Sequence, residues 1–467
     1  MRTKEKKTKQ RFIILLCIIL AIPVAWILIT RLEGGKPSIE IDFLSQTTGA
    51  SQELSISVAD MKSGLRRVWI GLLQNGMETV LLENDFPDKG LVVGGNKYEE
   101  TFNVKIDPDK RGIKDGKAIL RIVVCDFSWR HWFKGNRTYL EKNIIIDTKP
   151  PEIDIISRFH NINQGGACLV IYKLSEQCSK SGVYVEENFF PGHSGQFKNK
   201  NILMAFFALN YKQGPGTKIF VKAIDHAGNT SKAGFNYNLK RKIFKKDVIN
   251  ISDKFLNWKI PEFDIYTQQD SELTTKDKFL KVNQDIRKQS YNKVIKLVEK
   301  TDEVLYWDGV FLRLPKSANK AGFADNRVYK YKNKIIDRQI HLGIDLASIA
   351  QSPIPAANSG KVVFAGPIGI YGKTLIIDHG FGLQSMYAHL SSYNVKENQM
   401  VSKGEIIGRT GITGLAGGDH LHYSILIHNT FVNPIEWWDK AWIKNNISSK
   451  INKAEEDWKS SPRNDTE

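Results

Sequence analysis

The chain has 467 residues, and 67 Lys and Arg against 50 Asp and Glu give it a formal net charge of +17. At roughly 150 residues per domain this length predicts about three domains. With 41% hydrophobic and 25% charged residues, most of the chain should be folded. The basic residues are scattered and no nucleic-acid-binding module is visible, so we expect no nucleic acid partner. The charge suits a polyanionic cell envelope of wall polymers and acidic lipid heads, or simply favours solubility.

The first 31 residues join a basic stretch to an apolar one. An uncharged run extends from Phe12 to Thr30 and is closed by Arg31. As a helix it would span about 28 Å, close to the hydrocarbon thickness of a bilayer. Basic residues before the run favour a cytoplasmic N-terminus. Residues 1–31 are therefore expected to form a basic tail and a single-pass anchor in the cytoplasmic membrane, with the bulk of the chain in the periplasm or extracytoplasmic space.

A cleaved signal peptide is the main alternative to this anchor. The apolar run continues through Trp26 to Ile29, and no small-x-small cleavage site follows it. Cys17 is preceded by Leu16, where a lipoprotein signal has a small residue. An uncleaved anchor is therefore favoured.

Short runs of alternating apolar and polar residues follow, separated by turn residues, which is the pattern of β-sandwiches. The run at residues 151–157 repeats the pattern of residues 37–43. Residues 223–231 resemble the strand-end signature of bacterial immunoglobulin-like modules. We expect two such β-sandwiches, at residues 37–147 and 148–250. The fold alone does not decide whether they act as spacers, wall-binding surfaces or docking modules.

The pattern then changes from strands to helix. From about Ser271 to Asp302, apolar residues recur at helical spacing among Lys, Glu and Gln, without Gly or Pro. Residues 251–302 are therefore expected to form a helical connector that packs against the next domain or partly covers it. That domain is expected at residues 303–440. Residues 441–467 are polar and are expected to be a frayed helix or a tail.

The four cysteines constrain function little. Cys17 lies in the predicted membrane span and Cys125 in an apolar, strand-like run. Cys168 and Cys178 are ten residues apart on what the pattern predicts to be two adjacent strands. An exported domain allows a disulfide between them, and two unpaired thiols are nearly as consistent with the sequence. Their spacing matches no zinc knuckle.

Six of the ten histidines fall between residues 341 and 428, and this clustering motivates a metal hypothesis. His341 and Asp345 are separated by a short stretch that contains Gly343, which leaves room for a bend. His420 and His422 belong to an alternating run, so as strand residues they project from the same face. His389 follows another strand-like run, in Tyr387-Ala388-His389-Leu390. Imidazoles and a carboxylate are good zinc ligands.

These residues carry a resemblance to a known family. The span from about Ala321 to Trp437 resembles a LytM-type domain of the lysostaphin-like zinc metallopeptidases, the M23 family. His341 and Asp345 match the H-x-x-x-D element of that family, and His420 and His422 match its H-x-H element. The family's intervening catalytic histidine, in a Tyr-x-His-Leu setting, matches His389. Residues 323–329, 355–362, 403–408 and 411–414 also look familiar, whereas residues 415–419 form a longer loop than is usual before H-x-H.

The resemblance implies roles for five residues. His341, Asp345 and His422 would bind one zinc ion per catalytic domain, with water in a fourth position, as a catalytic site requires. His389 and His420 would flank the water and the scissile carbonyl as catalytic residues. The sequence does not decide which of the two is the base and which stabilises the oxyanion. Structural roles are expected for His379, His428, His131, His160, His193 and His226.

The sequence thus predicts a mainly β protein with an N-terminal transmembrane helix, two immunoglobulin-like β-sandwiches, a helical connector and a LytM-type antiparallel β-sheet peptidase domain. The implied function is zinc-dependent hydrolysis of peptide bonds in peptidoglycan stems or cross-links. The implied partners are peptidoglycan, the cytoplasmic membrane through the N-terminal helix, and cell-wall machinery proteins.

Two alternative functions of this domain do not involve catalysis. LytM-type domains also act as activators of other wall hydrolases, but such members commonly lack a metal ligand that this chain retains. A wall-binding scaffold with a structural metal is the other, and three ligands with two flanking histidines argue against a closed structural site. The sequence does not say which bond is cut, or whether other parts of the chain occlude the site.

Overall fold

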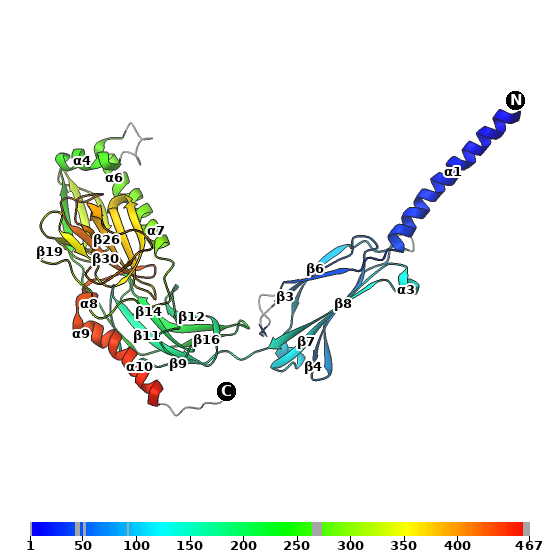
Figure 1. Ribbon diagram of the computed structural model, residues 1–467, viewed down its shortest axis with the longest axis horizontal. Helices are drawn as coiled ribbons and strands as arrows, with labels where there is room; N and C mark the ends of the chain where they lie inside the picture. Colours follow the sequence, from blue (N-terminus) through cyan, green and yellow to red (C-terminus); the bar gives the residue numbers. More distant parts are fainter. Residues whose placement is uncertain (1, 43–46, 50–52, 91–92, 264–272, 461–467) are drawn as a thin grey trace. The chain divides into compact units, whose positions relative to one another are not determined.

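The computed structural model describes residues 2–42, 47–49, 53–90, 93–263 and 273–460. The chain divides into two compact units. The first contains residues 1–151 with 224–230, and the second contains residues 152–223 with 231–467. Figure 1 shows that most elements in both are strands. The prediction of a mainly β protein with an apolar N-terminal helix is confirmed.

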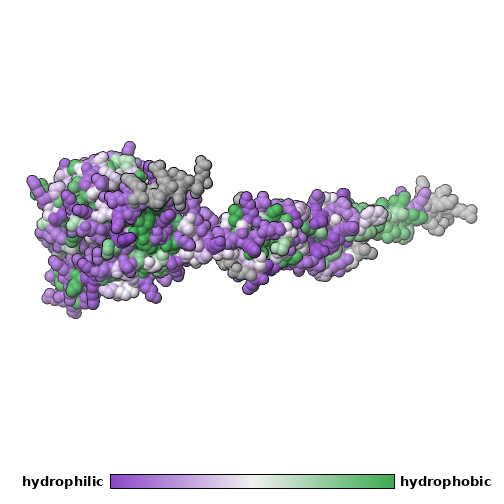
Figure 2. All heavy atoms as spheres, turned by 90° about the horizontal axis from the view of Figure 1, so that it is seen from below, coloured by the Kyte–Doolittle hydropathy of each residue, from purple (hydrophilic) through white to green (hydrophobic). Residues whose placement is uncertain are grey.

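The first unit begins with helix α1 (Arg2–Arg31). Its segment Gln10–Arg31 is, among the described residues, the one helix long and apolar enough to cross a membrane. Figure 2 shows apolar side chains along this helix, and none of the segment is buried. Such a helix is compatible with a single-pass anchor or with a signal sequence.

Two sheets of the first unit pack around one core, and together they are called sandwich 1. The three-stranded sheet has the order β1 (Ser38–Asp42), β3 (Glu53–Ala59), β6 (Glu99–Lys105). The five-stranded sheet has the order β2 (Thr47–Thr48), β8 (Arg137–Ile146), β7 (Gly116–Asp126), β4 (Leu65–Gln74), β5 (Met77–Asp85). Alternate residues point inward, so that the core includes Leu54, Ile56, Val68, Ile70, Ile122 and Val124. Two short helical turns, α2 (Pro108–Arg111) and α3 (Arg130–Phe133), connect strands.

A second set of sheets, called sandwich 2, follows. Its three-stranded sheet has the order β14 (Ile202–Ala208), β11 (Ala167–Leu174), β9 (Ile153–Ile155). Its four-stranded sheet has the order β13 (Asn188–Pro191), β12 (Cys178–Val185), β15 (Ile219–Asp225), β16 (Thr230–Ala233). A two-stranded sheet pairs β10 (His160–Asn163) with β17 (Tyr237–Lys240). The prediction that Cys168 and Cys178 lie on adjacent strands is wrong, because β11 and β12 belong to different sheets. The two cysteines are thiols rather than a disulfide.

Helices follow strand β18 (Lys246–Ile251). They are α4 (Asp253–Lys259), η1 (Ile260–Phe263), α6 (Thr275–Lys281), the π turn η2 (Val282–Ile286) and α7 (Arg287–Leu297). Ser252 and Thr274 cap α4 and α6 by accepting hydrogen bonds from backbone N–H groups at 3.2 Å. Apolar residues at helical spacing are buried, namely Phe279, Val282, Ile286, Val294 and Val298. Because α7 contacts β24 and η3, the segment is packed on the large sheet described next.

The large sheet has the order β19 (Ala318–Ala321), β22 (Ile344–Ala347), β30 (Leu421–Ile427), β26 (Leu383–Leu390), β25 (Gly372–Asp378), β24 (Gly360–Ile368), β28 (Met400–Val401), with β31 (Thr430–Val432) on β30. Beside it lie η3 (Gly369–Tyr371) and the sheet β23 (Pro353–Pro355), β29 (Ile406–Arg409), β27 (Ser392–Tyr393). Strand β18 pairs in parallel with β20 (Asn326–Tyr331), which pairs with β21 (Lys334–Ile340). The central strands β26 and β30 are entirely buried.

The segment after the large sheet is helical to Ser460, with α8 (Ile435–Trp438), α9 (Lys440–Ile443), the π turn η4 (Lys444–Ser448) and α10 (Ser449–Ser460). Glu436 accepts hydrogen bonds from Asn163 Nδ2 at 2.7 Å and from the Ala167 N–H at 2.9 Å. Lys450 donates to the Leu169 carbonyl at 2.8 Å. These bonds attach sandwich 2 to the helices that follow the large sheet. Sandwich 2 and the large sheet share one hydrophobic core. Residues 461–467 of the expected tail lie outside the described residues.

Candidate metal centre and active site

Three buried side chains converge at one end of the large sheet. Nε2 of His341 lies 3.0 Å from Oδ1 of Asp345 and 2.9 Å from Nδ1 of His422. Nδ1 of His422 lies 2.9 Å from the same carboxylate oxygen. Each residue thus points one donor atom at a common centre, and the three are arranged to hold a metal ion. Two imidazoles and a carboxylate form a donor set that suits zinc, so the residues fit the metal that the sequence implies.

Strand register brings these residues together. Asp345 on β22 is directly opposite His422 on β30 in the antiparallel ladder. His341 lies before β22, and the chain bends between them at Gly343. A Cβ atom at position 343 would lie 2.5 Å from Nε2 of His422 and 2.6 Å from Oγ of Ser424. The bend therefore requires glycine, because any larger residue would displace a candidate ligand.

A second layer of hydrogen bonds fixes which atom of each residue faces the centre. Nδ1 of His341 is 2.8 Å from the Gly322 carbonyl, so this nitrogen carries the proton and Nε2 is free to bind. The Ser424 hydroxyl donates to the Leu342 carbonyl at 2.8 Å. Its oxygen therefore accepts the Nε2 proton of His422 at 3.1 Å, which frees Nδ1.

The carboxylate is oriented in the same way. Arg327 on β20 donates through Nη2 to Oδ2 of Asp345 at 2.6 Å, which leaves Oδ1 to face the two histidines. Arg327 also forms an ion pair with Asp247 on β18, at 3.5 Å from Nε. Because the parallel pair β18–β20 holds this arginine, strand β18, which follows sandwich 2 in the sequence, supports the centre.

Two more histidines flank the centre. The ring of His389 is 4.8 Å from that of His420 and 5.8 Å from that of His422, measured between centroids. Nε2 of His420 is 3.5 Å from Oδ1 of Asp345. Nδ1 of His389 is 2.8 Å from the Thr413 carbonyl, and Nδ1 of His420 is 2.8 Å from the Gly418 carbonyl. In its neutral form each ring therefore carries its proton on Nδ1 and has a lone pair on Nε2.

The backbone of His389 is unusual. Its φ angle is +64°, in the left-handed region that non-glycine residues rarely adopt. The register between β25 and β26 shifts at this point, so that Lys373 is opposite Leu390 while Leu375 is opposite Tyr387. The irregularity places an extra residue at the end of β26 and turns the His389 ring toward the centre. Such strain is common at functional sites.

Burial and neighbouring charge shift the pKa of Asp345, His389, His420 and His422. Burial opposes ionisation of Asp345, but the adjacent imidazoles outweigh it and lower the pKa of this carboxyl well below its usual value. Burial lowers the pKa of His422 to about 4. Burial and the nearby His420 and His422 lower the pKa of His389 well below its usual value. Burial also disfavours the charged form of His420, but Asp345 outweighs it and raises the pKa of that residue.

The structure places the other histidines away from this cluster. Nδ1 of His379 bonds the Ser359 carbonyl and its Nε2 bonds the Ser385 hydroxyl, both at 2.7 Å. His193 stacks between Phe381 and His428, with ring centroids 5.1 and 5.7 Å apart. His160 is buried against Phe235 in sandwich 2. Nδ1 of His193 is 3.8 Å from a carboxylate oxygen of Glu303. Among the described residues, however, none of these three histidines belongs to a group whose donor atoms are close enough together to hold a metal ion.

A basic pocket of about 660 Å³ adjoins the metal centre, and His341 and His422 lie in its wall. Its other walls come from sandwich 2, from α7 and from the end of β21. Four cationic side chains line it and no carboxylate does, among the described residues; they are Lys212, Arg287, Lys288 and Arg338. Tyr371, whose ring centroid is 5.4 Å from that of His422, also lines the pocket.

Sequence reasoning did not assign roles to several residues of this site. Arg327 belongs to a matching segment and Ser424 follows the H-x-H element by two residues, yet their orienting bonds depend on three-dimensional contacts. Lys212 and Lys288 lie 129 and 53 residues before His341, counted along the sequence. Neither spacing nor periodicity indicates that they reach the site.

The fold and the cluster together define a mainly β protein with a His-Asp-His centre flanked by two further histidines. Residues 339–434 match the model of Peptidase family M23, so the chain contains a peptidase M23 domain. DD-carboxypeptidase/endopeptidase Mpg of Neisseria meningitidis is 40% identical over 97 residues, which are 21% of this chain and 22% of that protein.

Other similar proteins include the peptidoglycan DD-endopeptidase ShyA of Vibrio cholerae, 35% identical over 96 residues, which are 21% of this chain and 22% of that protein. The solved catalytic domain of the antimicrobial peptidase lysostaphin from Staphylococcus simulans is 28% identical, with a TM-score of 0.24. That match covers 28% of this chain and 98% of the solved chain. The present chain spans about a fifth of the length of the curated relatives it matches.

Proposed function

We propose that this protein is a zinc-dependent endopeptidase that hydrolyses peptide bonds in the stems or cross-links of peptidoglycan. One observation carries the proposal: donor atoms of His341, Asp345 and His422 converge within 3.0 Å of one another, each oriented by an outer hydrogen bond. The match to Peptidase family M23 and relatives named as peptidoglycan DD-endopeptidases support the substrate.

Each residue has a specific task in this mechanism. His341, Asp345 and His422 would hold the zinc, which when bound would supply Lewis acidity that polarises an amide carbonyl and activates water. Nε2 of His389 has a lone pair because Nδ1 donates to the Thr413 carbonyl, so this ring can accept a proton from the attacking water. Asp345 raises the pKa of His420, so Nε2 of this ring can carry a proton while Nδ1 donates to the Gly418 carbonyl. In that form His420 can stabilise the developing oxyanion or pass the proton to the leaving amine.

The basic pocket indicates which part of the substrate binds beside the centre. Peptidoglycan stem peptides carry free carboxylates, and a wall of Lys212, Lys288 and Arg338, with no acid among the described lining residues, attracts them. We propose that a carboxylate-bearing part of the stem occupies this pocket while the scissile bond lies at the zinc. Sandwich 2 and α7 would then belong to the substrate-binding surface.

We also propose that α1 is an uncleaved anchor with its N-terminus in the cytoplasm, so that the M23 domain faces the wall. The length and apolar character of Gln10–Arg31 and the basic residues before it support this orientation.

The proposed activity is tested by digestion of purified peptidoglycan with full-length protein in neutral detergent, with the products identified by mass spectrometry. Parallel samples contain the His341→Ala variant, and wild type after chelation and after return of zinc. We expect cross-linked fragments to disappear only where ligands and zinc are both present. Intact cross-links in every sample would contradict catalysis and favour an activator of other wall hydrolases.

A further inference from the structure

The turn α3 in sandwich 1 holds two large apolar side chains in solvent. His131, Trp132 and Phe133 have φ angles of 52°, 59° and 64°, three consecutive residues in the region that L-residues disfavour. Trp132 is 92% exposed and Phe133 is 61% exposed. Strained backbone conformations cluster at functional sites, so this exposed apolar pair is a candidate for a function.

This turn is attached to the end of α1. The Trp129 N–H donates to the Arg31 carbonyl at 2.6 Å, and the Ser128 hydroxyl donates to the same carbonyl at 3.1 Å. Nε of Arg130 donates to the Leu32 carbonyl at 3.0 Å. Figure 1 shows α3 beside the C-terminal end of α1. If α1 crosses a bilayer, Trp132 and Phe133 lie where that helix leaves it, at the level where aromatic residues gather in membrane proteins.

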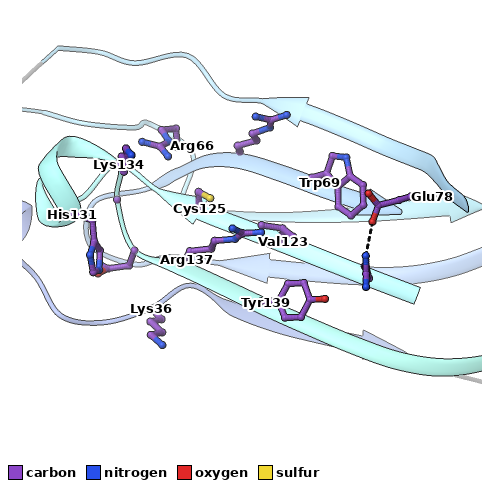
Figure 3. A pocket seen from close by; sticks show the side chains of 14 residues that line it. Lys36, Arg66, Trp69, Glu78, Val123, Cys125, His131, Lys134, Arg137 and Tyr139 are labelled. Carbon is purple, nitrogen blue, oxygen red and sulfur yellow. Dashed lines mark hydrogen bonds and ion pairs between the residues drawn. The ribbon is translucent and has the colours of Figure 1, made fainter. Parts of the chain in front are cut away.

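Next to the turn, the outer face of the five-stranded sheet of sandwich 1 contains a cavity of about 820 Å³ (Figure 3). Nη1 of Arg66 in its wall donates to the Phe133 carbonyl at 3.1 Å, which joins the cavity to the turn. Among the described lining residues Glu78 is the one carboxylate, against six cationic residues: Lys36, Arg66, Arg67, Arg121, Lys134 and Arg137.

Two of the six cations are neutralised and four are not. Arg67 pairs with Glu83, and Arg121 pairs with Glu78 at 3.0 Å and with Glu141 at 2.7 Å. The other four have no carboxylate within ion-pair distance among the described residues; they are Lys36, Arg66, Lys134 and Arg137. The cavity therefore carries an excess of positive charge that an anion can neutralise.

The same cavity offers apolar surface. Trp69 lies over Gly71 on β4, where a Cβ atom would be 2.2 Å from Cη2 of the indole, so the flat placement of the ring depends on glycine. Tyr139, which is half exposed, lies on the same face, and the Arg137 guanidinium is 6.0 Å from its ring centroid. An anionic group attached to an apolar body fits such a surface better than a free inorganic ion.

We propose that this face of sandwich 1 is a membrane-contact surface: Trp132 and Phe133 insert at the headgroup level, and the cavity binds the phosphate of an anionic phospholipid. The inference rests on the proposed role of α1 as an anchor. A lipid is favoured over a wall polymer because the exposed aromatic pair and the cavity adjoin the end of the apolar helix.

Insertion of Trp132 is tested in nanodiscs that contain full-length protein and phosphatidylcholine brominated close to the glycerol, which quenches nearby tryptophans. The difference in emission between wild type and Trp132→Ala reports Trp132, and the difference with Trp26→Phe reports α1. We expect both contributions to be quenched. Quenching of Trp26 without quenching of Trp132 would overturn the membrane-contact surface and leave the anchor intact. Absence of both would overturn the anchor as well.

The cavity is tested by titrating full-length protein in neutral detergent with short-chain phosphatidylglycerol, short-chain phosphatidylcholine, inorganic phosphate and poly(glycerol phosphate). We expect the protein to bind phosphatidylglycerol in preference to the other ligands. The double variant Lys134→Gln with Arg137→Gln should bind it roughly 20-fold more weakly, because each cation strengthens the attraction to an anionic lipid. The control pair Lys110→Gln with Lys114→Gln, exposed in the same unit but outside the cavity, should bind as wild type. Equal binding of both lipids, or binding of the polymer alone, would overturn the proposal.

Discussion

Two groups of buried histidines in the second unit have similar surroundings but different arrangements. His341 and His422 lie at the end of the large sheet, and His193 and His428 lie where sandwich 2 packs on the same sheet. Burial lowers the pKa of His422 to about 4 and that of His428 to about 3. Burial and a shifted pKa therefore do not distinguish them.

The orientation of the ring nitrogens distinguishes the two groups of histidines. In the first group, outer acceptors bind one ring nitrogen and leave the other facing a shared carboxylate. In the second, His193 stacks between Phe381 and His428, and of the two histidines only His193 has a carboxylate, Glu303, within ion-pair distance among the described residues. Convergence of free donor atoms, rather than burial, therefore distinguishes a candidate metal centre from a packed core.

The largest effect is expected when a metal ligand of the first group is removed. His341→Ala removes one of three ligands, so we expect zinc loss and a fall in peptidoglycan cleavage of at least about a thousandfold. His379→Gln, which changes a buried histidine outside the cluster, should retain bound zinc even if it lowers stability. Zinc content by mass spectrometry, measured beside thermal unfolding, checks the pair. A zinc-loaded, active His341→Ala variant would contradict the assignment.

The next effect separates chemistry from metal binding. His389→Ala should retain zinc and lower the cleavage rate by roughly 100-fold to 10,000-fold, as expected for loss of a general base. The rate and the zinc content are measured on the same preparation. If the variant lost its zinc, His389 would be a ligand rather than a flanking base.

A smaller effect tests the outer hydrogen bonds. Ser424→Ala removes the acceptor that orients His422, and we expect zinc affinity to fall roughly 10-fold to 100-fold. Competition with a chelator of known affinity measures the change. Thr430→Ala alters a hydroxyl on the adjacent strand that bonds Asn188 and Asn429 instead, so it should leave zinc affinity unchanged. Equal affinity of all three proteins would show that the orienting bond is dispensable.

The basic pocket should affect substrate binding rather than the metal. Lys288→Glu with Arg338→Glu should raise KM for stem peptides roughly 10-fold, with little change in zinc content, because each reversal repels a substrate carboxylate. The control is Lys300→Glu with Lys334→Glu, exposed residues outside the pocket that make the same charge change. A matching loss in the control would show that net charge, rather than the pocket, is responsible.

The smallest effect concerns the second group. His428 and His193 are neutral when folded, because burial lowers the pKa of both, but an unfolded histidine titrates near 6.5. Below that pH the unfolded state binds more protons, so the free energy of unfolding falls as the pH falls. Each histidine contributes up to about 1.4 kcal/mol per pH unit. His428→Asn should flatten this slope, since Asn tolerates the positive φ of 48°. Denaturant titrations from neutral to acidic pH measure it, and an unchanged slope would exclude this contribution.

Much of the site could be predicted because its ligands lie in short, ordered motifs. His341 and Asp345 are four residues apart, and His422 pairs directly with Asp345 across β22 and β30. The mainly β fold was also predictable, since alternation along strands such as β3 and β7 follows their burial. Local patterns carry both kinds of information.

The rest depends on contacts between segments far apart in the chain. The adjacent placement of Cys168 and Cys178 was wrong because strands consecutive in sequence can enter different sheets. Lys212 reaches the basic pocket only because sandwich 2 packs on the large sheet. Neither outcome is encoded in the local alternation of apolar and polar residues.

The assignment of the His-Asp-His cluster as the catalytic metal centre is tested by stepwise addition of zinc to metal-free, full-length protein, with peptidoglycan cleavage measured after each step. The convergence of His341, Asp345 and His422 predicts that the rate rises in proportion to added zinc and reaches a plateau at one zinc per chain. It also predicts no recovery in Asp345→Ala at the same zinc concentrations. Cleavage without zinc, or full recovery in that variant, would contradict the claim that this cluster is the catalytic metal centre.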